Sequence, residues 1–361
     1  MSQMTRSAVY EVADAGIAFK RHVLPELGSQ DLLVKVSAAA LNRADVLQRY
    51  GKYAPPPGET DVPGIEIAGE VVAVGSDVNS HEDALRDGVD GDVSGNRTGR
   101  AAAYAGEYRC GDKVCGVVSG GGFSEYCILD SKMAMPIPQT WTFEEAAAWP
   151  EAALTADEAL NGLGGVSAGQ VVLVHAASSG IGTMLVKMGC ELGAVMVATT
   201  STPSKVAALS TLGAQHVIAG AGRDFAPCVR NATGVAPMDV DVVVDFMGGA
   251  YLNGNIDVLK RGGRLVLAGV MDGHISEVDL VPLINKRIQL LPLTLRMKPL
   301  AEKRAVNARF LRRWVETSKF HALKPVVHAI FPFEQLAQAQ MLMESNKHFG
   351  KIVVSMTNVF S

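Results

Sequence analysis

The sequence has no apolar run of the roughly 20 residues that a membrane-spanning helix needs, and its first ten residues, MSQMTRSAVY, lack the apolar core of a secretory signal peptide. It also lacks a basic block that could follow a phosphate backbone, because 33 Lys and Arg stand against 37 Asp and Glu. These absences predict a cytoplasmic protein that binds neither a membrane nor nucleic acid.

Cysteine is sparse as well. The five cysteines are odd in number and irregularly spaced, which favours reduced thiols over a disulfide framework. Apolar residues make up 48% and charged residues 19% of 361 residues, so the composition is that of a globular protein and the length predicts two domains.

The first part of the chain predicts an irregular, mostly β domain. Short β-type runs at residues 32–37 and 67–74 are broken by Gly and Pro, with a short helix predicted at residues 43–50. Residues 76–111 are rich in Gly, Asp, Asn and Arg and are predicted to form a surface insertion.

From residue 169 the pattern becomes regular. Helix-type segments at 184–192 and 203–212 follow strand-type runs, and the predicted strands are 171–175, 195–199, 216–218, 241–246, 264–269 and 288–293. Alternation of helices with apolar strands predicts a doubly wound parallel sheet, so the fold class is α/β. Residues 301–317 predict an amphipathic helix, and residues 351–355 a last strand that returns to the first domain.

The run HAASSGIG, His175 to Gly182, joins the first strand of this sheet to its helix. Exposed amides and the helix dipole at such a turn can hold a pyrophosphate. The run departs from the strict G-x-G-x-x-G pattern, and the alternative is an ordinary turn that uses glycine for its geometry. Its position at the start of the alternation favours dinucleotide binding.

No acidic residue follows the second strand, where an NAD site usually places one. The run after Thr199 has hydroxyls and a cation instead, including Ser201 and Lys205, which suits the 2′-phosphate of NADPH. The alternative is that Thr202 or Ser204 caps a helix and Lys205 is a solvated charge.

The chain resembles the quinone oxidoreductases of the medium-chain dehydrogenase/reductase superfamily, above all the zinc-free, zeta-crystallin-like branch. The similar segments are ALNRAD (40–45), QR (48–49), Gly51, Tyr53, PPP (55–57), GIEIAG (64–69), GGGFSEY (120–126), LTA (154–156), ASSGIG (177–182), DFMGG (245–249) and GKIV (350–353). They cover nearly the whole chain except residues 76–111.

This resemblance implies a GroES-like catalytic domain, residues 1–153 and 296–361, and a Rossmann domain, residues 154–295, with the active site in the cleft between them. It implies NADPH contacts at these positions: Tyr53, Thr155, His175, Ala176, Ala177, Ser178, Ser179, Gly180, Ile181, Ser201, Lys205, Gly220, Phe246, Gly269, Val270, Met271 and His348. Gly220 stands where relatives often have a Tyr, and the alternative for His348 is a solvated tail residue.

Zinc-dependent relatives use a Cys and a Gly-His-Glu motif for the catalytic metal and four cysteines for a structural one. The corresponding residues are Asn42 and Gly64-Ile65-Glu66, and three cysteines between residues 110 and 127 are too few. Both metal sites are therefore predicted to be absent. Without a Lewis acid, a quinone or another conjugated carbonyl suits hydride transfer better than a simple ketone, because its negative charge is delocalised.

Asn42 and Tyr53 are the candidate catalytic donors to the acceptor. The alternatives are that Asn42 makes a turn and that Tyr53 stacks on the nicotinamide. The predicted function is an NADPH-dependent quinone oxidoreductase, with an alkenal or enoyl reductase as the runner-up and a non-catalytic NADPH-binding factor as a third hypothesis. An apolar edge strand at residues 288–293, which relatives cover with a second copy, predicts a homodimer.

Overall fold

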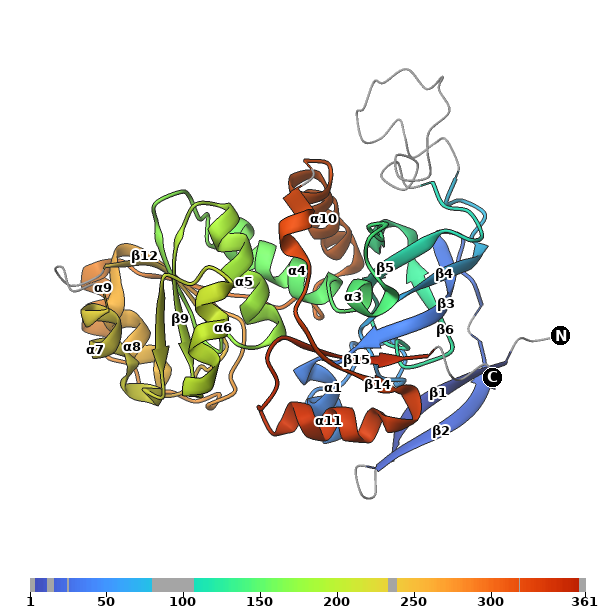
Figure 1. Cartoon of the computed structure of the whole chain (residues 1–361), viewed down its shortest axis with the longest axis horizontal. Coiled ribbons are helices and arrows are strands. Elements are labelled where there is room, and N and C mark those ends of the chain that lie inside the picture. The colour runs from blue at the N-terminus through green and yellow to red at the C-terminus, as the bar shows by residue number, and fades with distance from the viewer. Residues whose placement is uncertain are drawn as a thin grey trace, which may run out of the picture. The chain divides into compact units, whose positions relative to one another are not determined.

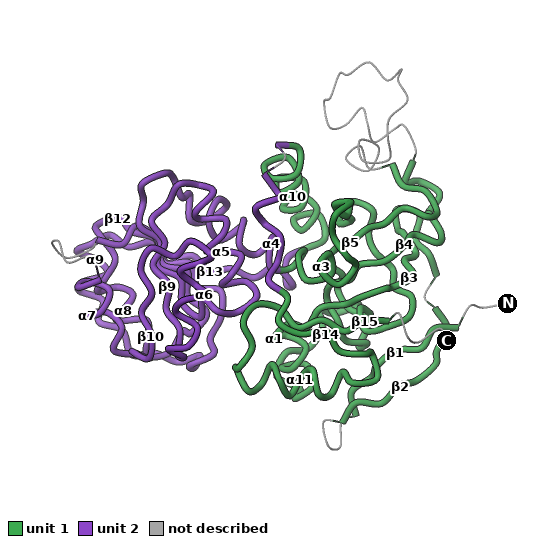
Figure 2. Tube along the Cα trace, in the orientation of Figure 1, with its two compact units in different colours: residues 1–151, 299–316, 327–361 green, residues 152–298, 317–326 purple. Residues whose placement is uncertain are grey.

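The computed structural model describes residues 4–11, 16–24, 26–79, 107–232, 239–317 and 319–356. It divides into two compact units (Figure 2). Unit 1 comprises Met1–Glu151, Pro299–Glu316 and Val327–Ser361, and unit 2 comprises Ala152–Lys298 and Thr317–Val326. Most of the predicted insertion, residues 80–106, lies outside the described residues.

The predicted domain boundaries differ from these units mainly at residues 317–326. The prediction gave this segment to the first domain, whereas it belongs to unit 2. The ammonium group of Lys187 donates to the main-chain carbonyl of Lys324 at 2.5 Å, which ties the segment to unit 2. The sequence around residue 320 carries no local signal for this long-range contact.

Unit 1 is built on a seven-stranded sheet with the order β14-β15-β3-β4-β5-β7, in which β6 also pairs with β3 (Figure 1). A separate antiparallel pair is formed by β1 (Met4–Glu11) and β2 (Gly16–Val23). The sheet strands are β3 (Asp31–Ala40), β4 (Glu66–Val74), β5 (Lys113–Val117), β6 (Tyr126–Asp130), β7 (Ala134–Pro136), β14 (Val327–Pro332) and β15 (Lys351–Ser355). The helices are α1 (Arg43–Arg49), α3 (Phe143–Ala147), α10 (Leu300–Phe310) and α11 (Leu336–Glu344).

Strand β15 lies beside β3 in an antiparallel pair, which confirms the prediction that the end of the chain returns to the first domain. Close packing of β3 on β4 requires Gly69, because a Cβ there would lie 2.1 Å from the carbonyl oxygen of Lys35. Helix α1 begins after Asn42, whose main-chain N–H donates to the Asp45 carboxylate at 2.7 Å. Strand β3 thus ends directly before the segment that contains Asn42 and Tyr53.

Unit 2 is a doubly wound sheet of six parallel strands with the order β10-β9-β8-β11-β12-β13, as predicted. Helices α5 and α6 lie on one side of the sheet and α7, α8 and α9 on the other (Figure 1). The strands are β8 (Val171–Val174), β9 (Val195–Thr200), β10 (His216–Ala219), β11 (Val240–Asp245), β12 (Leu259–Leu267) and β13 (Gln289–Pro292). The helices are α4 (Pro150–Asp157), α5 (Gly180–Glu191), α6 (Val206–Thr211), α7 (Phe225–Asn231), α8 (Tyr251–Val258) and α9 (Leu280–Lys286).

Two predicted helices differ in their bounds. Helix α5 begins at Gly180 rather than at residue 184, because the Ser179 hydroxyl caps it by accepting from the N–H of Gly182 at 3.0 Å. The predicted helix 203–212 starts as a 3₁₀ turn at Pro203–Lys205, as expected of a proline in a first turn.

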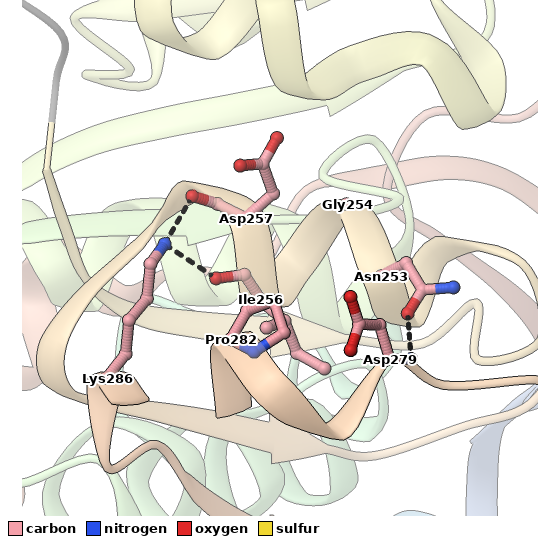
Figure 3. Close-up of a pocket in the computed structure, with 7 residues that line it drawn as sticks. All are labelled: Asn253, Gly254, Ile256, Asp257, Asp279, Pro282 and Lys286. Atoms are coloured by element: carbon pink, nitrogen blue, oxygen red, sulfur yellow. Dashed lines mark hydrogen bonds between the residues drawn. The ribbon is translucent and has the colours of Figure 1, made fainter. Parts of the chain in front are cut away.

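Helices α8 and α9 enclose a small pocket in which Lys286 has a structural role (Figure 3). Its ammonium group donates to the carbonyl oxygens of Ile256, Asp257 and Leu259 at 2.7–3.0 Å. All three N–H donors of the ammonium are therefore used to close the C-terminal end of α8. Among the described residues, no helix is long and apolar enough to cross a membrane.

Candidate functional site

Apart from Thr155 on α4, the predicted cofactor residues of unit 2 follow the carboxyl ends of the strands of its parallel sheet. His175 to Ile181 follow β8, Ser201 follows β9, and Gly220 follows β10. Phe246 follows β11, and Gly269 to Met271 follow β12. Main-chain bonds of 2.9–3.1 Å join Ala177 to Thr199 and Gly220 to Thr200, both at the end of β9, and join Met271 to Phe246. This edge is where doubly wound sheets bind their ligands.

The turn between β8 and α5 has the features of a pyrophosphate cradle. Gly182 must be a glycine, because a Cβ there would lie 2.4 Å from the carbonyl oxygen of Ala176. Ala176 itself has a positive φ of 49°, which tightens the turn. Within the described part of the chain, the amides of Gly180 and Ile181 have no hydrogen-bond acceptor. Two such donors at the N-terminus of a 12-residue helix fit an anionic group.

The side chain of His175 holds the strand ends together. It is fully buried, with Nδ1 2.9 Å from Oγ1 of Thr199 and Nε2 2.7 Å from Oδ1 of Asn255. Burial lowers the pKa of His175 to about 4, although the bond to Asn255 opposes this shift. Both ring nitrogens are occupied, so only the position of His175 beside the turn supports its predicted cofactor contact.

Asp245 continues this network and shapes the loop after β11. Its carboxylate accepts from Nδ2 of Asn255 at 2.9 Å and from the N–H groups of Met247 and Gly248 at 2.6–3.3 Å. Burial raises the pKa of Asp245 to about 6, against the opposing effect of these hydrogen bonds. Asp245 therefore fixes the loop that contains Phe246, a role that was missed from the sequence.

In the segment after β9, Ser201 directly follows the strand and Lys205 is the last residue of the 3₁₀ turn Pro203–Lys205. Ser201 is exposed, whereas Lys205 is only 9% exposed and burial lowers its pKa. The alternative that Lys205 is a solvated surface charge is therefore wrong. Thr202 stands at the N-cap position, but its side chain makes no capping hydrogen bond. A largely buried cation after the second strand, where an NAD site usually has an acid, suits a phosphate group.

The other predicted contacts of unit 2 differ in exposure. Thr155, on α4, is 5% exposed and Phe246 is 8% exposed. Val270 and Met271 are each 50% exposed. Val270 and Met271 are therefore accessible to a ligand in the loop after β12, whereas Thr155 and Phe246 are largely buried.

Arg223 and Asp272 brace the same edge. The Arg223 guanidinium donates to Oδ1 of Asp272 at 3.0 and 3.3 Å, and the other carboxylate oxygen accepts from the N–H of Ala250 at 3.3 Å. This bridge links the loops after β10, β11 and β12. Neither residue was singled out in the sequence.

Three predicted residues belong to unit 1. Tyr53 is half-buried in the proline-containing loop after α1. His348 lies between α11 and β15 and is 8% exposed, so the alternative that it is solvated is wrong. Asn42 is 7% exposed at the start of α1.

Asn42 takes part in a buried polar cluster with Glu66 and Lys351. Its Nδ2 donates to Oε1 of Glu66 at 2.8 Å, and its Oδ1 accepts from Nζ of Lys351 at 2.8 Å. Lys351 also pairs with Glu66 at 2.5 Å; the exposures are 4% for Lys351 and 0% for Glu66. The alternative local role is present as well, because Asn42 is the N-cap residue of α1 and forms a capping box with Asp45. In addition, its amide bonds across 24 residues to Glu66.

The described residues contain no group of three or more His, Cys, Asp or Glu side chains that could hold a metal ion. Asn42 and Glu66 stand where zinc-dependent relatives are expected to carry metal ligands. The cation that contacts their side-chain oxygens is the ammonium group of Lys351. Cys115 and Cys127 are buried, and burial raises the pKa of Cys127 to about 12.

Two family profiles match the chain one after the other. One is described as an alcohol dehydrogenase GroES-like domain and covers residues 28–139, and the other is described as a zinc-binding dehydrogenase and covers residues 212–354. The chain belongs to the medium-chain dehydrogenase/reductase superfamily. This confirms the predicted GroES-like and Rossmann-type architecture.

The relatives within this superfamily differ in size and name. A phenolphthiocerol/phthiocerol polyketide synthase of Mycobacterium tuberculosis is 30% identical over 326 residues; the match covers 89% of this chain, which spans only 13% of that relative's length. The crystal structure of CurK enoyl reductase matches with a TM-score of 0.79 and 24% identity over 97% of this chain and 99% of that one. The quinone oxidoreductase from Coxiella burnetii matches with a TM-score of 0.74 and 23% identity over 98% and 100%.

Proposed function

We propose that this protein is an NADPH-dependent quinone oxidoreductase that needs no zinc. The observation that carries the proposal is the carboxyl edge of unit 2. There the amides of Gly180 and Ile181, which have no acceptor among the described residues, are combined with a buried Lys205 and no acidic residue after β9. Amides suit a pyrophosphate, and a cation in place of an acid suits a 2′-phosphate. The superfamily fold supports an oxidoreductase but does not choose its acceptor.

In this proposal, each group of residues has a separate role. NADPH, when bound, supplies the hydride. The turn after β8 holds the pyrophosphate, and Lys205 with Ser201 holds the adenosine phosphate. Asn42 and Tyr53 donate hydrogen bonds to the oxygen of the acceptor as negative charge develops there. A quinone spreads that charge over its ring, so neutral donors suffice where a simple alkoxide would need a Lewis acid.

Lys205→Ala is expected to weaken NADPH binding by roughly 10- to 100-fold, or about 1.5–3 kcal/mol, because a charged hydrogen bond to the 2′-phosphate is lost. NADH has no such phosphate and should bind as it does to the wild type. Titration calorimetry with both cofactors measures the difference. Lys286→Ala is the matched control, because that lysine only closes α8. Equal weakening of both cofactors by Lys205→Ala would contradict the assignment.

Turnover is expected to be unchanged after dialysis against a strong chelator. The ammonium of Lys351 already lies between Asn42 and Glu66, and Ile65 cannot act as a metal ligand. Metal analysis of the purified protein should find far less than one zinc per chain. Loss of activity on chelation, with recovery on adding zinc, would instead favour an alcohol dehydrogenase.

A second candidate function is the reduction of a conjugated double bond in an alkenal or enoyl substrate. It is favoured by the 30% identity to a polyketide synthase and by the shared fold of CurK enoyl reductase. Rates of NADPH consumption with ortho-quinones, para-quinones and α,β-unsaturated aldehydes separate the two. Higher kcat/KM with quinones supports the first function, and higher kcat/KM with unsaturated aldehydes supports the second.

A homodimer through the edge of β13 is also proposed. The sheet order of the described residues ends at this strand. The proposed interface patch consists of apolar side chains of β13, of α9 and of the segment before α9, which are 47% to 78% exposed: Ile275, Leu280, Val281, Ile284 and Leu290. Such a patch and an open edge favour a second copy related by two-fold symmetry, although Pro292 limits the length of the pairing.

Light scattering at micromolar concentration should give the mass of two chains. The double variant Ile284→Asp/Leu290→Asp should shift the protein to one chain, because charges at the patch would be desolvated on pairing. Met341→Asp, at an equally exposed apolar residue of α11, is the control and should remain a dimer. A monomeric wild type would contradict the proposal.

A further inference from the structure

We propose that Lys351 is a positioning residue that fixes the orientation of the Asn42 amide, so that one N–H of that amide is kept for the acceptor oxygen. This inference rests on the proposed function, because it assigns a task to a residue that the function places at the acceptor. Lys351 lies 309 residues from Asn42 in the sequence, at the start of β15.

The ammonium group of Lys351 cannot itself donate a hydrogen bond to the substrate oxygen. Its three acceptors are the main-chain oxygen of Leu41 at 3.0 Å, Oδ1 of Asn42 at 2.8 Å and Oε1 of Glu66 at 2.5 Å. An ammonium group has three N–H donors and no lone pair, so all of its capacity is used. Its contribution is therefore made through the side chains that it holds.

Two anchors of opposite character determine which way the Asn42 amide faces. Lys351 only donates, so it can bind only the amide oxygen. The Glu66 carboxylate, which pairs with the Lys351 ammonium, only accepts, so it can bind only the amide nitrogen. Rotating the amide by half a turn would set nitrogen against the ammonium and oxygen against the carboxylate, and both contacts would become repulsive.

The anchors are themselves fixed. The second oxygen of Glu66 accepts from the main-chain N–H of Glu151 at 2.9 Å. The main-chain N–H of Asn42 donates to Asp45, which also accepts from the N–H of Gly64 at 3.3 Å. Glu66 and Asp45 are thus each held by a further main-chain contact.

One hydrogen of the Asn42 amide remains weakly engaged. Nδ2 lies 2.8 Å from Glu66 but 3.5 Å from the carbonyl oxygen of Ala40, a distance at which a hydrogen bond is weak. A stronger acceptor, such as a developing oxyanion, can take this hydrogen without breaking the contact with Glu66. A buried ion pair is often neutral or unfavourable for stability compared with apolar residues, which is consistent with a role in positioning.

The test uses the variants Lys351→Met, Glu66→Gln and the double variant of both. Lys351→Met alone leaves the Glu66 carboxylate buried without its cation, so it should lower both the melting temperature and kcat. The double variant has no uncompensated charge, and Gln can still accept from Nδ2 of Asn42. We expect its melting temperature to recover while kcat stays roughly tenfold or more below wild type, the effect of about one lost hydrogen bond.

The affinity for NADPH should be unchanged in all three variants, so the loss falls on kcat. Lys286→Met is the matched control, because it also removes a lysine with three oxygen partners but should leave kcat as in the wild type. As a second readout, the Asn42 side-chain amide signals in ¹⁵N NMR should broaden or split in Lys351→Met. A double variant with wild-type kcat, or an unchanged amide signal, overturns the positioning role.

Asn42→Ala separates this inference from the proposed function. If Asn42→Ala and Tyr53→Ala both turn over quinones like the wild type, the assigned active site is wrong. If Asn42→Ala is slow while the double variant is as fast as the wild type, only the role of Lys351 is wrong.

Discussion

Asn42→Ala is expected to lower kcat/KM for quinones by about 2–4 kcal/mol, the usual cost of removing a donor to a developing oxyanion. The change leaves the Lys351–Glu66 pair in place, so the fold should survive. The affinity for NADPH should change little, because the proposed cofactor cradle lies in unit 2. Steady-state kinetics together with cofactor titration measure both quantities.

Tyr53→Phe is the companion variant, since it keeps the aromatic ring and removes only the hydroxyl. A strong loss of kcat would assign proton or hydrogen-bond chemistry to Tyr53, and near-normal turnover would leave stacking as its role. Wild-type turnover in both Asn42→Ala and Tyr53→Ala would show that the active site lies elsewhere.

His175 and Asp245 are expected to give the protein opposite responses to pH that nearly cancel. The pKa of His175 falls from 6.5 to about 4 on folding, so its contribution to stability is present above pH 6.5 and is lost as pH falls toward 4. The pKa of Asp245 rises from 3.8 to about 6, so its contribution is present below pH 3.8 and is lost as pH rises through 6. Each corresponds to about 3 kcal/mol over its window.

Two variants separate the opposing pH responses of His175 and Asp245. His175→Gln removes the first response, so the free energy of unfolding should rise by up to about 3 kcal/mol between pH 6 and 4 relative to wild type. Asp245→Asn removes the second, so the free energy of unfolding should fall over the same interval relative to wild type. Urea denaturation at several pH values measures both slopes. Parallel pH profiles for the wild type and both variants would mean that neither group is perturbed.

Most strands of unit 2 were predictable because they are short, nearly continuous apolar runs. Strand β12 (Leu259–Leu267) is the exception: it was predicted only from residue 264, because its first half contains Lys260, Arg261 and two glycines. Strand β9 differs from its prediction only at Thr200, and in unit 1 strand β15 occupies the predicted residues 351–355. The start of α5 was missed because two glycines in its first turn oppose a helix by propensity. There the cap by Ser179 and the tight fit of Gly182 against Ala176 decide the conformation.

The predicted site residues lie in short sequence patterns, whereas the contacts that were missed join residues far apart in the sequence. The turn at 175–182 and the missing acid after β9 could be seen as short patterns. The partners of Asn42 could not, because Lys351 lies 285 residues from Glu66 and only the fold brings them together. One signal was present: Lys351 opens an otherwise apolar strand, Ile352 to Val354, in which a buried lysine needs an acidic partner.

The central claim is that NADPH bound at the carboxyl edge of unit 2 reduces a conjugated carbonyl acceptor without a metal. It is tested most directly by following NADPH consumption and acceptor reduction together, with chelator present and with NADPH carrying deuterium at the transferred position. We predict that the two reactions proceed in equal amounts, faster with quinones than with simple ketones, and with a primary isotope effect. An enzyme that binds NADPH but consumes none with any quinone or unsaturated aldehyde would contradict the claim and favour a non-catalytic NADPH-binding protein.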